Sequence, residues 1–316
     1  MREETGTGPA AGDRAAPAVG GAIGATPVAL IGAVRPRRTE WSRAWRRFKR
    51  YRPALAGLTV IVVLVIVALA PGLFAPYDPE APFAGMRGRG PTAAHPLGFD
   101  EIGRDILSRT IFGARVALLV AFTATSLSLL IGVTVGALAG YFGGWVDLIL
   151  SRIVDALMAF PLLVLLVALA AAFRPSLRVA ILVIGITAWA QYARVVRAEV
   201  LSLRERDFVL AARALGVPSS RIIFRHLLPN VMGLVIVLAS LSIAGVILTE
   251  SALSFLGLGT QPPDASWGAM LSSGRTYILS YPHIALFPGV MITITVLAFN
   301  LLGDGLRDAF DPRMKV

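Results

Sequence analysis

Cysteine is absent from this chain of 316 residues. Disulfide frameworks, thiolate nucleophiles and cysteine-ligated zinc or iron–sulfur centres are therefore excluded. Lysine is almost absent too, because Lys49 and Lys315 are the only two. A Walker A loop needs a lysine directly after its glycines to reach nucleotide phosphates, and neither lysine follows a glycine-rich loop. The chain therefore contains no P-loop of its own.

Histidine is also scarce, and the three histidines, His95, His226 and His283, lie far apart in the sequence. No H-E-x-x-H or G-x-S-x-G pattern occurs. We therefore expect no catalytic residue, no metal site and no bound cofactor in this chain. His95, which precedes a proline, is interpreted as a turn residue, and His226 as a capping or interface residue.

Charged residues make up only 16% of the chain, against 56% hydrophobic residues and a mean hydropathy of +0.72. Such a chain has more apolar surface than a soluble domain of this length could bury, which predicts a membrane protein. The net charge is +11, and the arginines cluster beside hydrophobic runs. That placement indicates lipid headgroups as the partner of the basic residues, and not nucleic acid.

Hydrophobic stretches of about 20 residues, the length of helix that crosses a bilayer, predict an all-α protein with six membrane spans. The fourth stretch is short, and Arg178 and Arg194 at its ends are expected to extend it by reaching the headgroups. Gly132, Gly136 and Gly140 recur every four residues in the second stretch, which favours close helix packing. The six predicted spans are Pro53–Tyr77, Val116–Val146, Ala156–Phe173, Val179–Ala193, Leu227–Thr249 and Thr276–Gly303.

The N-terminal region divides into two parts before the membrane domain of residues 53–316 begins. Residues 1–34 are rich in Ala, Gly, Pro and Thr, a composition that predicts a disordered tail. Residues 35–52 hold nine basic residues with Trp41, Trp45 and Phe48 at helical spacing. This pattern predicts an amphipathic helix at the cytoplasmic membrane surface.

The distribution of Lys and Arg predicts the orientation in the membrane. With six spans and a cytoplasmic N-terminus, the segments on the inner side hold 20 basic residues and those on the outer side hold 8. Cytoplasmic loops carry the excess of positive charge. We therefore expect a multi-pass plasma (inner) membrane protein with both termini in the cytoplasm.

A polar stretch, residues 203–226, separates the fourth and fifth spans and is called the elbow below. Its first part has the periodicity of an amphipathic helix that ends near residue 215. One helical face is small and apolar, which suits a close approach by another protein, although resting on the lipid surface is the alternative. The residues of this face are Phe208, Ala211, Ala212 and Leu215.

Turn signals divide the elbow in two. Gly216 is suited to the left-handed conformation that ends a helix, and Pro218 prevents its continuation. Ser219 or Ser220 is expected to cap a second short helix over Arg221–His226, before the fifth span begins. The elbow is therefore predicted to be a helix, a turn and a helix on the cytoplasmic side.

The elbow resembles the EAA loop of permease subunits in ATP-binding-cassette importers. The resemblance rests on the spacing of Ala211, Ala212 and Gly216 and on "HLLPN" at His226–Asn230. Further stretches resemble the C-type subunit of the dipeptide and oligopeptide permease subfamily. They are His95–Val116, Gly140–Asp155, Ser202–Val209, Ala252–Leu271 and Asn300–Arg313.

The resemblance implies a type I importer permease fold in which the elbow is a coupling helix. It implies two separate ATPase subunits that bind ATP and Mg²⁺, a second, homologous permease subunit, and an extracytoplasmic binding protein. Such a protein would dock on the outer segments 78–115 and 250–282, and ordinary loop packing is the alternative interpretation of these segments. Leu210 stands where the family often has glutamate, so Arg221 and Arg225 are expected to contribute more to the interface. The expected coupling residues are Phe208, Leu210, Ala211, Ala212, Leu215, Gly216, Arg221 and Arg225.

Polar residues inside or beside the spans are candidates for the wall of a translocation pathway. Arg152 and Asp155 are three positions apart and are expected to pair on one helical face, either at headgroup level or at the mouth of the pathway. Glu250 carries the same two alternatives. Asn300 is polar enough to face a pathway but is equally suited to hydrogen bonding between helices.

The cargo that the resemblance implies is a dipeptide or oligopeptide, with nickel and haem-type compounds as alternatives within the same kind of permease. A self-powered secondary transporter is the rival class, and a membrane scaffold is another. Secondary transporters typically show internal repeats and buried ionisable relays. The chain shows no convincing repeat and few charges within its spans, which favours the importer.

Overall fold

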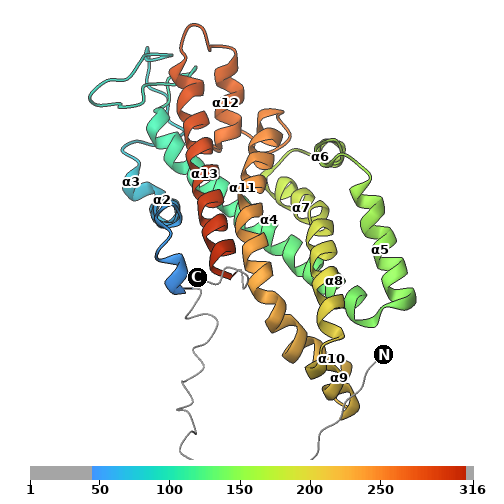
Figure 1. The fold of residues 1–316 in the computed structure, drawn as a ribbon. Helices are drawn as coiled ribbons and strands as arrows, with labels where there is room; N and C mark the ends of the chain where they lie inside the picture. Colours follow the sequence, from blue (N-terminus) through green and yellow to red (C-terminus); the bar gives the residue numbers. More distant parts are fainter. Residues whose placement is uncertain (1–44, 311–316) are drawn as a thin grey trace, which may run out of the picture. The chain divides into compact units, whose positions relative to one another are not determined.

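The computed structural model describes residues 45–310, and these form a bundle of helices without a named strand (Figure 1). Predictions for residues 1–34 fall outside the described residues, as does most of the segment 35–52. The all-α expectation is confirmed for the described part. Its elements are α2 (Arg52–Leu69), α3 (Pro71–Phe74), α4 (Ile106–Phe142), α5 (Gly144–Met158), α6 (Leu162–Ala171), α7 (Leu177–Thr187), α8 (Trp189–Arg204), α9 (Asp207–Ala214), α10 (Ser219–Ile222), the π-helix η1 (Ile223–Leu227), α11 (Leu228–Phe255), α12 (Trp267–Arg275) and α13 (His283–Phe310).

Five helical stretches within residues 45–310 are long and apolar enough to cross a membrane, or six if the bent pair α5–α6 counts as one span. The two axes of that pair meet at 84°. The third span is therefore not the straight helix Ala156–Phe173 that the sequence predicts. Pro161 caps the start of α6, and proline can neither donate a backbone hydrogen bond nor continue the preceding helix, so α5 ends at Met158.

All the other spans differ from the prediction at their ends. α2 ends at Leu69 and not at Tyr77, and α11 continues beyond Thr249 to Phe255. α4 begins at Ile106, ten residues before the predicted span, because the Asp105 side chain caps it by accepting a hydrogen bond from the Ser108 backbone N–H at 2.8 Å. α7 and α8 together run from Leu177 to Arg204. Arg194 therefore lies within a helix and does not mark its end. The last span is α13, and the preceding residues 276–282 form turns.

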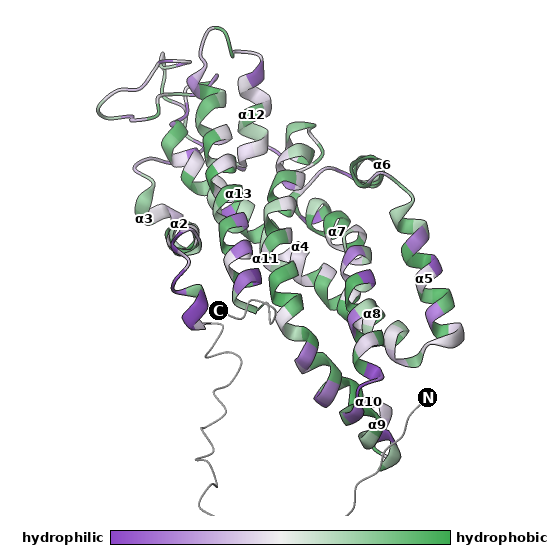
Figure 2. Cartoon of the chain, viewed as in Figure 1, coloured by the Kyte–Doolittle hydropathy of each residue, from purple (hydrophilic) through white to green (hydrophobic). Residues whose placement is uncertain are grey.

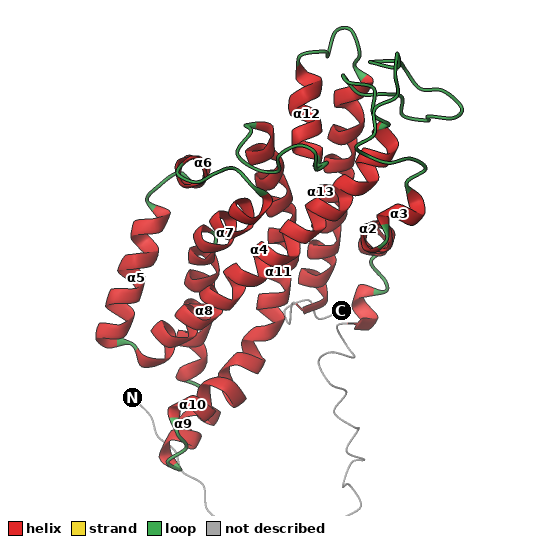
Figure 3. Cartoon of the chain, turned by 180° about the vertical axis from the view of Figure 1, so that it is seen from behind, coloured by secondary structure: helices red, strands yellow, loops and turns green. Residues whose placement is uncertain are grey.

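α4 is the central helix and packs against α2, α5, α7, α8 and α11 (Figures 1 and 3). Its contact with α8 is close because glycines lie at the interface. A Cβ atom built on Gly132 would lie 2.6 Å from Tyr192 Cβ, and one on Gly136 would lie 2.6 Å from the Ala193 carbonyl oxygen. The packing role predicted for these glycines is confirmed.

The bundle of residues 45–310 has two polar ends. The elbow end carries α9 and α10, and the loop end carries the loop of residues 75–105 and α12 (Figure 1). Figure 2 shows hydrophilic residues at the elbow end, and hydrophilic patches that also interrupt α5 and α8 along their length. α5 and α8 therefore carry charges within their length, and α13 carries Asp304, Arg307 and Asp308 towards its C-terminal end.

The described end of the basic N-terminal segment packs on the protein. Phe48 is buried in a cluster with Ala54 and Ala309, whereas Trp45 is exposed. The predicted surface helix thus has one aromatic residue that contacts α13 and not the lipid.

Candidate functional site

The elbow turns at Gly216, as its sequence predicts. Gly216 has φ = 71°, its N–H donates to the Arg213 carbonyl at 2.9 Å, and the Val217 N–H donates to the Ala212 carbonyl at 3.1 Å. These two bonds form a Schellman motif, which ends α9 and satisfies its last carbonyl groups. The turn after α9 is therefore fixed by backbone hydrogen bonds.

The predicted face of α9 divides between two environments. Ala212 is buried with Val209 against α8 and η1, so it is not available to a partner protein. The other predicted coupling residues are exposed, and so is Phe224, which the sequence reading missed. The exposed elbow surface consists of Phe208, Leu210, Ala211, Leu215, Gly216, Arg221, Phe224 and Arg225.

The second half of the elbow differs from the prediction. Pro218, and not a serine side chain, occupies the cap position of α10, and the chain runs without a break through η1 into α11. The π turn precedes Pro229, which lacks the N–H needed for a regular turn. The Asn230 side chain donates to the His226 carbonyl at 2.6 Å. The elbow is therefore joined to the fifth span by continuous helix.

Tyr141 of α4 contacts both halves of the elbow. The Arg213 guanidinium of α9 lies 4.8 Å from the centre of the Tyr141 ring, and the Tyr141 hydroxyl donates to Ser219 Oγ of α10 at 3.3 Å. Tyr141 itself is buried. The sequence gives no signal for this contact because the residues lie more than 70 positions apart.

Two ion pairs join α5 to α8. Asp155 binds Arg194 at 2.8 Å, so the predicted pairing of Asp155 with Arg152 is wrong. Arg152 is exposed on α5. Nearer the elbow end, Asp147 binds Arg197 through both of its oxygens, with 2.6 Å between Arg197 Nη2 and Asp147 Oδ2. The sequence could have indicated the Asp147–Arg197 pair, because charged residues of opposite sign in neighbouring spans are normally paired.

Glu250 is buried near the loop end of α11, with an exposure of 1%. It accepts hydrogen bonds from Ser254 Oγ at 2.7 Å and from Ser251 Oγ at 3.5 Å. Ser254 Oγ also accepts from the Thr260 N–H at 3.1 Å. Glu250 therefore holds the chain that follows α11, and it does not line an open surface. Asn300 is exposed on α13, and its role in the pathway stays a prediction.

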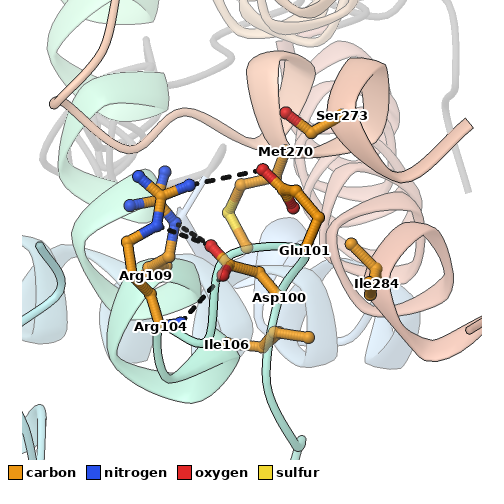
Figure 4. Close-up of a pocket in the computed structure, with 8 residues that line it drawn as sticks. All are labelled: Asp100, Glu101, Arg104, Ile106, Arg109, Met270, Ser273 and Ile284. Carbon is orange, nitrogen blue, oxygen red and sulfur yellow. Dashed lines mark hydrogen bonds and ion pairs between the residues drawn. The ribbon is translucent and has the colours of Figure 1, made fainter. Parts of the chain in front are cut away.

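Charged residues also shape the loop end (Figure 4). Arg104 binds Asp100 at 2.6 Å and Glu101 at 3.4 Å, and Arg109 lies 3.6 Å from Asp100. The Arg109 guanidinium also donates to the Pro79 carbonyl at 2.9 Å. This cluster lies beside α12 and α13 and fixes the loop of residues 75–105 on the bundle.

An aromatic cluster also fixes the loop of residues 75–105. His95 Nδ1 lies 2.9 Å from Asp105 Oδ1, and the imidazole ring stacks on Tyr77 at a centroid distance of 4.3 Å. The ring also contacts Phe83 and Phe99. His95 thus has a larger structural role than the turn residue predicted from the sequence.

Known proteins are similar to this chain over most of its length. Residues 132–316 match the family model "Binding-protein-dependent transport system inner membrane component", and residues 39–91 match "N-terminal TM domain of oligopeptide transport permease C". The dipeptide transport system permease protein DppC of Alkalihalophilus pseudofirmus is 44% identical over 88% of this chain and 91% of its own. The oligopeptide transport system permease protein OppC of Haemophilus influenzae is 42% identical over 87% of this chain and 89% of its own.

A third relative and a solved structure extend the comparison. The glutathione transport system permease protein GsiD of Pectobacterium atrosepticum is 42% identical over 88% of this chain and 93% of its own. A chain from inward-facing MetNI, a methionine ABC transporter, superposes with a TM-score of 0.54 at 20% identity. That match covers 65% of this chain and 97% of the other, and it supports the fold alone.

Proposed function

This chain belongs to the family of binding-protein-dependent transport system inner membrane components, and on that premise we propose that it is the C-type permease subunit of an ATP-driven importer of short peptides. The named relatives transport dipeptides, oligopeptides and glutathione. All three kinds of cargo are short peptides, which supports this class over nickel or haem-type compounds.

The observation that carries the proposal is the exposed elbow surface. Leu215 is 83% exposed, and Phe208, Leu210 and Phe224 of the same short segment are exposed as well. Several large apolar side chains exposed on one segment that also carries arginines are typical of a protein interface. An ATPase subunit in the cytoplasm is the partner that this surface suits, because the chain has no P-loop and the elbow is predicted to face the cytoplasm.

The connections of the elbow indicate how ATPase movement would reach the membrane. Arg213 and Ser219 both contact Tyr141 of α4, and η1 continues into α11. A displacement of the elbow is therefore transmitted to two spans together, which would tilt them between inward-open and outward-open states. The coupling free energy of such linked sites is typically about 1 to 3 kcal/mol. The other partners in the proposal are a second, homologous permease and an extracytoplasmic binding protein docked at the loop end.

The test is copurification of the ATPase subunits with the tagged chain. Leu215→Glu places a charge in the exposed elbow surface, and we expect ATPase copurification to fall at least tenfold. Leu279→Glu is the matched control, because Leu279 is 97% exposed but lies at the loop end. Equal losses in both variants, or transport by the purified chain alone with a proton gradient, would refute the importer.

A further inference from the structure

A groove of about 210 Å³ lies between α4, α5 and α8. One wall is formed by small and apolar residues of α4, including Gly136 and Ala139. The opposite side is formed by α5 and α8, which meet mainly through the two ion pairs and a small cluster around Val154 and Trp189. The groove residues from α5 and α8 are Leu150, Ser151, Val154, Asp155, Ala193, Arg194 and Arg197.

The charged residues of the groove lie within α5 and α8, away from the elbow. Arg194 is ten residues from Arg204, where α8 ends, which corresponds to about 15 Å along the helix. Its side chain is 52% exposed, and that of its partner Asp155 is 53% exposed. Half-exposed charges in a membrane-spanning helix normally face a water-filled cavity or the protein interior, and not hydrocarbon. The open side of the groove is therefore a polar surface.

Charges of both signs line the groove, namely those of Asp155, Arg194 and Arg197. Asp147 binds Arg197 nearer the elbow, outside the lining of the groove. A short peptide with free termini carries an ammonium group and a carboxylate at neutral pH. We propose that this groove, which we call the zwitterion groove, binds both charged termini of a peptide in transit, with Asp155 contacting the ammonium group and Arg194 the carboxylate.

This proposal rests on the proposed function and names the chemistry that the pathway wall recognises. A phospholipid with an ethanolamine head carries the same two charges. The labelling experiment below separates the two, because a lipid bound in the groove would protect the thiol without added peptide. The peptide is the ligand that the proposed function supplies, and this favours it over the lipid.

The absence of cysteine allows a direct test in the complete importer reconstituted in nanodiscs. Ser151→Cys introduces one thiol that is nearly isosteric with the serine and lines the groove. A water-soluble maleimide should label it, and free dialanine at millimolar concentration should slow the labelling several-fold. N-acetyl-dialanine amide, which lacks both terminal charges, should have no effect.

Two further variants complete the test. Ser280→Cys in the segment between α12 and α13 is the control, because Ser280 is exposed at the loop end, away from α5 and α8 (Figure 1), and dialanine should not change its labelling. The double change Asp155→Asn with Arg194→Gln, made in the Ser151→Cys chain, keeps hydrogen-bonding groups but removes the charges. Protection by dialanine should then be lost, while the ATPase subunits still copurify.

Each other outcome would overturn the proposal. No labelling of the Ser151→Cys chain would mean that lipid or the second permease covers the groove. Labelling without protection would mean that water fills it and peptide does not bind, and equal protection by the blocked peptide would mean that the termini are not recognised. Failure of the proposed function is distinguished from these results, because it would appear as loss of ATPase copurification in the unmodified chain.

Discussion

Single residues in this protein fix loops by accepting several hydrogen bonds in buried positions. Glu250 and Asp105 are the two clearest cases. Asp105 accepts hydrogen bonds from both the N–H and the hydroxyl of Ser108 at 2.8 Å, in addition to its contact with His95. Glu250 accepts from two serines at the opposite end of α11 from the elbow. Both carboxylates act on the loop end of the bundle.

Glu250 provides a prediction at the residue scale. In Glu250→Leu the hydroxyls of Ser251 and Ser254 lose their acceptor, and a buried unsatisfied polar group costs about 1 to 3 kcal/mol. We expect a lower melting temperature for the purified chain in detergent. Glu250→Gln retains an acceptor oxygen and should lose less. If the leucine variant melts at the temperature of the unmodified chain, the anchoring role is wrong.

At the scale of helices, the close approach of α4 and α8 gives the clearest prediction for the stability of the protein. Gly136→Ala would place a Cβ atom 2.6 Å from the Ala193 carbonyl oxygen and 2.9 Å from Val196 Cβ. Because one of these neighbours is backbone, the two helices must separate, and overpacking of this kind costs about 1 to 3 kcal/mol. Thermal unfolding of the purified variant checks the expected loss.

Gly245→Ala is the matched control for that experiment. Gly245 also lies within a long helix, but a Cβ atom there meets nothing within 4 Å. Alanine is the better helix former, so this variant should be as stable as the unmodified chain or slightly more stable. Equal destabilisation by the two changes would show that helix crowding is not the cause.

Signals in the local sequence predicted where helices end better than they predicted which residues of different helices contact each other. Gly216 and Pro218 mark the end of α9 correctly, because the left-handed turn depends only on neighbouring residues. The bend at Pro161 also has a local signal, although the hydrophobic run from residue 156 to residue 173 concealed it. The partner of Asp155 is Arg194, 39 residues away, and only the packing of α5 on α8 determines that pairing. Residues such as Tyr141 and Phe224 acquire their positions in the same way.

At the scale of the whole molecule, the two polar ends of the bundle are predicted to lie on opposite sides of the membrane. Single cysteines at Ser220 in the elbow and Ser280 at the loop end, both exposed, report these ends. A membrane-impermeant maleimide should label the Ser280 variant in right-side-out spheroplasts. The Ser220 variant should react only in inside-out vesicles stripped of peripheral proteins. The reverse pattern would contradict both the orientation and the coupling role of the elbow.

The zwitterion groove also has a consequence for the lifetime of this protein in a cell when it is not assembled with a second permease. Without a second permease to complete an aqueous pathway, the half-exposed side chains of Asp155 and Arg194 would be exposed to lipid, which is unfavourable for charged groups within a membrane span. We expect membrane quality-control proteases to remove subunits that expose such groups. The abundance of this protein should therefore follow that of its partner, so that each cell accumulates only as much of it as it can assemble.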